Sequence, residues 1–257
     1  MGHERIGLLP KSRKWRDIVS SIAMASESEA ELSSLVTRTL EAVRNRYLNI
    51  HRDKGVQAAF GFLVGLTNPP NLRKGSVAGT DLDIKSNPSP LRITAALQSW
   101  VSSYANSLEY AELAKRAAAD VIGIWTERHA NQLDLFSGDR TAEGIWNKAS
   151  SASGFCEVSR LFFSKFTERY LRYFLEREAS SQISSFLERN QFEKRLSQHL
   201  DSISQHAFDT AKIMQSFAAG WYNNHVKAAA PSDNEIETFL RLAFGKIREE
   251  ILREATE

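Results

Sequence analysis

Cysteine, proline and glycine are scarce in this chain of 257 residues. The single cysteine, Cys156, excludes a disulfide framework within the chain and any zinc site that needs two or more thiolates, and it indicates a reducing compartment. Six prolines and thirteen glycines are too few for a turn-rich β architecture. We therefore expect a cytoplasmic protein without structural disulfides or β-hairpins.

The chain also lacks strong net charge and long hydrophobic runs. Its 33 Lys and Arg against 31 Asp and Glu give a net charge of +2. A globally basic surface that would bind nucleic acid or membranes is therefore excluded, and any such contact must be local. The most apolar window, residues 56–66, is well short of the roughly 20 residues that span a bilayer. We expect no stable transmembrane span. A membrane-active helical effector stays an alternative, because Gly61 and Gly65 have the spacing that packs helices closely in membranes.

Helical periodicity is present over most of the sequence. Trp15, Ile18 and Ile22 share one face of a helix, and the aromatic-rich stretch 155–174 predicts the central core helix. No segment shows the alternation of a half-buried strand. The sequence therefore predicts an all-α fold, a multi-helix bundle of about eight helices with no significant sheet.

Residues 67–90 interrupt this pattern, because they contain four of the six prolines and show no sustained helical periodicity of apolar residues. A loop of this length is unusual inside a compact domain, so it is either a functional loop or a link between helical blocks. We expect an N-terminal helical block at 1–66, a long loop or linker at 67–90 and a main helical domain at 91–257. The alternative is that 1–66 and 91–257 form one continuous domain.

Three helix-end signals can be located in the sequence. Ser28 with Glu31, and Ser232 with Glu235, have the spacing of a capping box, in which the serine and glutamate side chains each bind a backbone amide of the first turn. Gly55 follows a helical stretch and is expected to end it in a left-handed cap.

The segment 45–51, NRYLNIH, contains Arg46 and His51 separated by four residues. Histidine can act as acid or base near neutral pH and arginine can bind phosphate, so this pair suits metal-free RNA cleavage by the RNA 2′-hydroxyl. The spacing resembles the catalytic signature of HEPN ribonucleases, an α-helical family. The resemblance implies that Arg46 and His51 are catalytic, that the protein is a homodimer acting on RNA, and that it serves in prokaryotic defence or toxin systems.

This chain departs from the HEPN pattern at Tyr47, where the family commonly has a polar residue directly after the arginine. On a regular helix Arg46 and His51 lie about 140° apart, so they converge only at a helix end or across two subunits. A solvated basic helix terminus, favourably placed against the helix dipole, explains the same residues.

Two groups of basic residues are candidates for contact with nucleic acid or an acidic partner. The first precedes and enters the first helix: Lys11, Arg13, Lys14 and Arg16. The second forms a stripe opposite the aromatic face of the central helix: Lys165, Arg169 and Arg172. A flexible terminus and a salt-bridged solvent face are the respective structural alternatives.

No metal or cofactor site is expected, because the histidines lack paired spacing such as HExxH, and Cys156 on an apolar helix is expected to be a buried, inert thiol. Without a coherent catalytic set, the favoured hypothesis is a non-catalytic interaction subunit of a larger cytoplasmic, prokaryotic assembly. Its partners would be other protein subunits or a second copy of the chain. The HEPN-like ribonuclease, or an inactive relative, is the alternative.

Overall fold

The computed structural model describes residues 9–25, 28–75, 77, 80–104, 110–131, 141–210 and 212–254. Within these ranges it contains thirteen α-helices and no strand, which confirms the all-α fold. The first half comprises α1 (Arg13–Ser20), α2 (Ile22–Ala25), α3 (Glu29–Ala42), α4 (Arg44–Asn49), the 3₁₀ turn η1 (Ile50–Arg52), α5 (Lys54–Thr67), α6 (Pro69–Lys74), the 3₁₀ turn η2 (Ile84–Ser86) and α7 (Pro90–Tyr104). The second half comprises α8 (Ala111–Asn131), α9 (Ala142–Ala149), α10 (Ala152–Gln182), α11 (Phe186–Thr210), α12 (Lys212–Trp221), the π turn η3 (Tyr222–Val226) and α13 (Asp233–Glu254).

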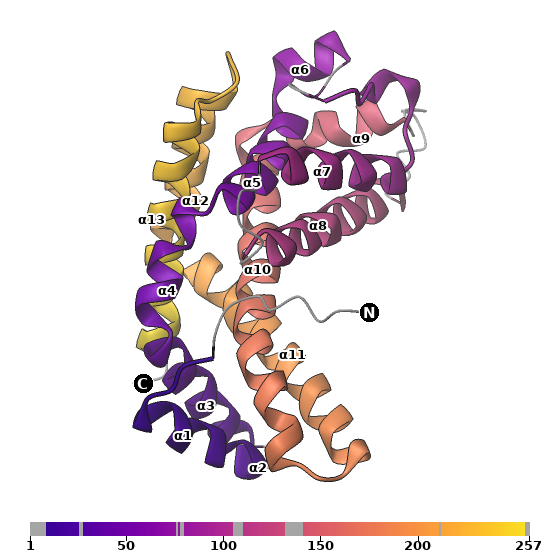
Figure 1. Cartoon of the computed structure of the whole chain (residues 1–257). Helices are drawn as coiled ribbons and strands as arrows, with labels where there is room; N and C mark the ends of the chain where they lie inside the picture. Colours follow the sequence, from indigo (N-terminus) through magenta and orange to yellow (C-terminus); the bar gives the residue numbers. More distant parts are fainter. Residues whose placement is uncertain are drawn as a thin grey trace.

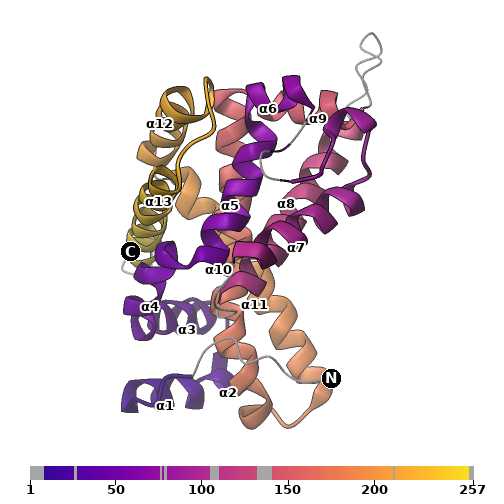
Figure 2. The same ribbon diagram turned by 45° about the horizontal axis from the view of Figure 1, so that its top comes forward.

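Helix α10 runs the length of the molecule and organises the other helices (Figure 1). Helices α5 to α9 surround its upper part, whereas α1, α2, α3 and α11 lie around its lower part, and α12 and α13 lie along one side (Figures 1 and 2). The predicted number of about eight helices is too low. A short break such as the one at Val43, between α3 and α4, does not interrupt the apolar pattern of 3.6 residues. Periodicity therefore predicts one helix where the structure has two.

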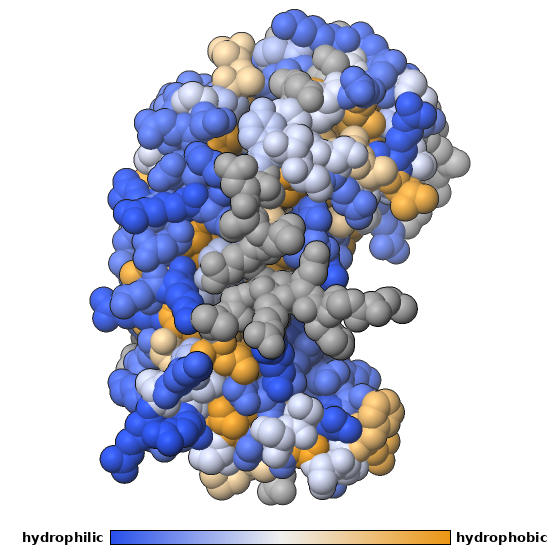
Figure 3. All heavy atoms as spheres, in the orientation of Figure 1, coloured by the Kyte–Doolittle hydropathy of each residue, from blue (hydrophilic) through white to orange (hydrophobic). Residues whose placement is uncertain are grey.

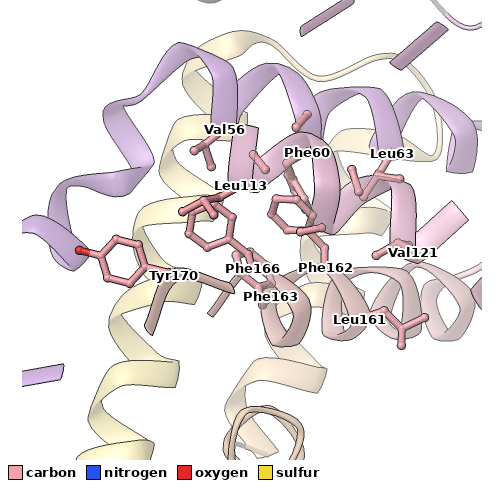
Figure 4. Close-up of a cluster of buried hydrophobic side chains, with 14 of the residues drawn as sticks. Val56, Phe60, Leu63, Leu113, Val121, Leu161, Phe162, Phe163, Phe166 and Tyr170 are labelled. Atoms are coloured by element: carbon pink, nitrogen blue, oxygen red, sulfur yellow. The ribbon is translucent and has the colours of Figure 1, made fainter. Parts of the chain in front are cut away.

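The core is built on aromatic side chains of α10 (Figure 4). Phe60 of α5 lies 5.2 Å from Phe162 and 5.5 Å from Phe163, measured between ring centroids, and stacks on Phe239 of α13 at 5.3 Å. The buried apolar residues form one cluster that extends from Trp15 to residue 251, on both sides of segment 67–90. This confirms α10 as the central core helix.

The expectation of a loop without regular structure at 67–90 is wrong for part of the segment, which contains α6 and η2. Asn68 caps α6 by accepting a hydrogen bond from the Asn71 amide, and Gly75 ends that helix in the left-handed region at φ +81°. Pro69 and Pro90 are the first residues of α6 and α7, where a proline loses no hydrogen bond. Two of the four prolines that indicated a loop, Pro69 and Pro90, therefore begin helices.

The helix-end signals have mixed outcomes. The Ser232–Glu235 capping box is confirmed, because Glu235 Oε2 accepts hydrogen bonds from the Ser232 amide at 2.7 Å and from its hydroxyl at 2.8 Å. Ser28 precedes α3 but its side chain makes no capping bond, so that box is not formed. The predicted cap at Gly55 is also wrong. Gly55 lies inside α5, whose N-cap is Asp53, and packs closely against α8.

Candidate functional site

His51 of η1 is buried, with 6% of its surface exposed. Its Nδ1 lies 2.8 Å from the backbone oxygen of Leu48, and its Nε2 lies 4.0 Å from Glu237 Oε1 of α13. Gln57 donates hydrogen bonds to the His51 oxygen at 2.8 Å and to Glu237 Oε2 at 3.1 Å. Gln57 of α5 therefore links the backbone of η1 to α13, and the imidazole faces the same glutamate.

Arg46 of α4 is half-buried and lies near Tyr170 of α10. Burial raises the pKa of the Tyr170 hydroxyl above its ordinary range, an effect that the positive charge of Arg46 opposes. Arg46 thus lies near α10, whereas His51 faces α13. Catalysis by the pair stays a prediction.

The three cations of the second basic group are paired with carboxylates from three helices. Lys165 lies 2.8 Å from Asp201 of α11, and Arg169 Nε lies 3.1 Å from Asp120 of α8. Arg172 is paired with Glu176 on the same helix. Burial alone would lower the pKa of Lys165, but hydrogen bonds to Asp201 and Glu168 outweigh it and raise that pKa. The stripe therefore forms ion pairs along α10, and contact with nucleic acid stays a prediction.

Sequence reasoning missed the role of Glu168, which lies at the centre of a layer of ion pairs and hydrogen bonds between α10 and α11. We call this the ion-pair layer; it consists of Lys165, Glu168, Arg172, Ser197 and Asp201. It is only 6% exposed, yet its carboxylate accepts hydrogen bonds from Ser197 Oγ at 2.6 Å and from Lys165 Nζ at 3.1 Å, and Arg172 lies at 3.7 Å. The available signal was its spacing, three residues after Lys165 and four before Arg172, which places all three on one side of a helix. Its layer joins α10 to α11 and presents no free charge to a ligand.

The first basic group, in contrast, is exposed at the start of α1. Lys11, Arg13, Lys14 and Arg16 have no carboxylate partner within the described part of the chain. Trp15 holds α1 in place, because its Nε1 donates to Glu178 of α10 at 3.0 Å and its ring packs edge-on against Phe174. These cations therefore project from a helix that is fixed to the body.

Large apolar side chains are exposed at the same end of the molecule. Met24 of α2 is 56% exposed, and Phe186 and Leu187 at the start of α11 are 72% and 67% exposed. Helix α2 lies beside the lower end of α10, next to the turn into α11, and hydrophobic surface is visible at that end (Figures 1, 2 and 3). We call this surface the basic–apolar end; it consists of Lys11, Arg13, Lys14, Arg16, Met24, Phe186 and Leu187.

A groove of about 340 Å³ lies at the opposite end, between α5, α7 and the start of α13. Helix α5 forms its floor with Ala58, Gly61, Phe62 and Gly65. One wall carries Trp100 and Tyr104 of α7, whose rings are 4.5 Å apart. The volume lies at the lower end of the range for small-molecule sites, which is about 300–1,000 Å³.

The second wall of the groove is held by Asn68, which is 1% exposed. Its Nδ2 donates to the backbone oxygens of Val226 at 2.6 Å and Ala229 at 2.9 Å, which fixes the chain between η3 and α13. This chain continues into Pro231 and Asp233, which line the groove.

The described ranges show neither a metal-binding cluster nor a membrane-spanning helix. They contain no group of three potential metal ligands among His, Cys, Asp and Glu, and none of their helices is both long and apolar enough to cross a membrane. Cys156 is half-buried rather than fully buried as the sequence suggests. Family models, curated proteins and solved structures were all compared with the chain, and none matches it.

Proposed function

We propose that this protein is a non-catalytic, all-helical interaction subunit of a larger cytoplasmic assembly, and that it docks through the basic–apolar end. The observation that carries the proposal is the exposure of Met24, Phe186 and Leu187 at the end of the molecule that also carries cations that no carboxylate neutralises in the described residues. Protein interfaces combine a buried apolar core with charges that set orientation and encounter rate. The partner would present an apolar pocket beside an acidic face.

The energetic argument concerns Phe186 and Leu187. Full burial of a Phe or Leu side chain stabilises a complex by about 1.5–3 kcal/mol relative to exposure. Phe186 and Leu187 lie at the tip of the hairpin formed by α10 and α11, and side chains held by helical backbone enter a pocket with little loss of backbone freedom. The cations would act chiefly on the association rate, which should fall as salt increases.

The experiment is affinity capture of the full chain from its native cells, with partners identified by mass spectrometry. The double variant Phe186→Ser/Leu187→Ser should lose a stoichiometric partner, whereas Leu91→Ser, which removes a 79% exposed leucine from α7 at the other end, should retain it. Arg13→Glu/Lys14→Glu should weaken capture, and acids in the first turn of α1 do not destabilise the helix.

Two results would contradict the proposal. One is a monodisperse monomer that captures no stoichiometric partner. The other is equal recovery of the partner by the wild-type protein and by Phe186→Ser/Leu187→Ser.

A further inference from the structure

We propose that Arg44 of α4 and Arg248 of α13 together bind a terminal phosphate group, as found in inorganic phosphate or in a phosphate monoester. The two arginines belong to helices that lie beside each other along one side of the molecule (Figures 1 and 2). This site uses no residue of the basic–apolar end and is independent of the proposed docking function.

Two contacts fix how α4 and η1 lie against α13. Tyr47 of α4 packs edge-on against Phe244 of α13, with 5.5 Å between the ring centroids. One turn later in the chain, Nε2 of His51 lies 4.0 Å from Oε1 of Glu237. The second contact is later in the sequence on the first segment and earlier on α13. The two segments therefore run antiparallel.

This register brings the two arginines together, one turn beyond the contact of Tyr47 with Phe244. Arg44 precedes Tyr47 by three residues and Arg248 follows Phe244 by four, so each arginine shares a helix face with its aromatic neighbour. Arg44 is exposed and Arg248 is half-buried. The Nε atom of Arg248 is buried without a hydrogen-bond partner in the described ranges, whereas its two terminal nitrogens reach the surface. A ligand can therefore contact both guanidinium groups from solvent.

The positive charge of this pair is not neutralised. Neither Arg44 nor Arg248 forms an ion pair with any residue that the structure describes, and the nearby carboxylate of Glu249 is paired with Lys246 at 3.0 Å. Burial and then the charge of Arg44 lower the pKa of Arg248, and the carboxylates of Glu249 and Glu41 do not offset this effect. Because like charges repel, an anion that contacts both guanidinium groups is favoured.

Two neighbouring guanidinium groups suit a terminal phosphate better than other anions. Arginine binds phosphate through two parallel N–H donors, and a terminal phosphate offers three acceptor oxygens and nearly two negative charges at neutral pH. A carboxylate has two oxygens and one charge, and a phosphodiester of a nucleic-acid backbone also has one charge. Of these groups, only the terminal phosphate matches the charge of both Arg44 and Arg248.

The test is isothermal titration calorimetry of the full chain at about pH 8 and constant ionic strength, with inorganic phosphate, phenyl phosphate and dimethyl phosphate. The first two are dianions at that pH, whereas dimethyl phosphate is a diester with one charge. At least one dianion should bind with a Kd below about 10 mM, and the diester should bind at least about tenfold more weakly. Tighter binding of phenyl phosphate than of inorganic phosphate identifies an ester as the ligand, and the reverse order identifies free phosphate. No binding of either dianion at about 10 mM, or a diester that binds as tightly, would overturn the proposal.

Variants locate the site. Arg44→Gln and Arg248→Gln should each weaken binding of the dianion about tenfold, because each removes one charge-assisted contact. Arg92→Gln removes an exposed arginine of α7 that also lacks an ion pair in the described ranges, and it should bind like the wild-type protein. Without ligand, thermal unfolding should give Arg44→Gln a Tm no lower than that of the wild-type protein, since the change relieves repulsion and glutamine suits a helix as well as arginine. Unchanged affinity in folded Arg44→Gln and Arg248→Gln would also overturn the proposal.

Discussion

Ser197 of α11 donates a hydrogen bond of 2.6 Å to the buried carboxylate of Glu168 in α10. The same carboxylate accepts a hydrogen bond from Lys165, which in turn reaches Asp201 of α11 at 2.8 Å. A buried charge is stable only when its partners satisfy it, so this layer fixes the alignment of α11 against α10. The alignment places Phe186 and Leu187 at the tip of the hairpin.

Glu168→Gln should therefore destabilise the fold. The change removes the charge that Lys165 and Arg172 share, while Lys165 keeps its ion pair with Asp201, so we expect a loss of about 1–3 kcal/mol. Urea denaturation measures the free energy of unfolding. Glu188→Gln, at an exposed position of α11, is the control and should change it by less than about 0.5 kcal/mol. If both variants unfold like the wild-type protein, the layer does not stabilise the hairpin.

Asn68→Asp should destabilise the junction between α5, α6 and η3. Aspartate keeps the acceptor that caps α6 but loses the Nδ2 donor, which leaves the oxygens of Val226 and Ala229 facing a carboxylate. Leaving a buried acceptor unsatisfied costs about 1–3 kcal/mol, so we expect a loss of about 2 kcal/mol in thermal or urea unfolding. Asn224→Asp, on the exposed side of η3, is the matched control. Equal stability of the two variants would contradict this role of Asn68.

The all-α class and the central position of α10 follow from periodicity alone. An apolar face repeated every 3.6 residues from Phe155 to Phe174 can be buried only by other helices on several sides, as found. The capping box at Ser232 was also predictable, because its hydrogen bonds join residues that are three positions apart.

The candidate site was not predictable, because its contacts join distant segments. Arg169 pairs with Asp120, which is 49 positions away, and Lys165 pairs with Asp201, which is 36 positions away. The sequence alone suggests ion pairs for these cations but does not identify the partners on α8 and α11. Likewise, the small-residue face of α5 predicts close packing but not that α7 and α13 leave a groove above it.

Gly55 and Gly123 should respond oppositely to alanine. A Cβ at Gly55 would lie 2.3 Å from the Cβ and 2.8 Å from the Cα of Ala111, so α5 and α8 would have to separate, at a cost of about 1–3 kcal/mol. A Cβ at Gly123 meets nothing within 4 Å, and alanine favours a helix interior over glycine by about 1 kcal/mol. Thermal unfolding should give a lower Tm for Gly55→Ala and a higher Tm for Gly123→Ala. A stabilising Gly55→Ala would contradict the close contact of α5 with α8.

Glu235 should make a pH-dependent contribution to stability. Hydrogen bonds from the backbone and then the side chain of Ser232, followed by His225, lower the pKa of its carboxyl from 4.5 to about 2. A carboxyl whose pKa is lower in the folded state stabilises the fold fully above pH 4.5 and loses this contribution as the pH falls towards 2. The side chain is 37% exposed, so solvent screening keeps the effect small.

The variant Glu235→Gln should thus be less stable than the wild-type protein at neutral pH, and the difference should shrink between pH 4.5 and 2. Urea unfolding across that range measures it, with Glu127→Gln as the control for the loss of an exposed carboxylate. The capping box also shapes the groove wall, because it fixes the start of α13 where Asp233 lies. A difference between Glu235→Gln and wild type that stays constant down to pH 2 would show that the carboxylate charge does not stabilise this helix start.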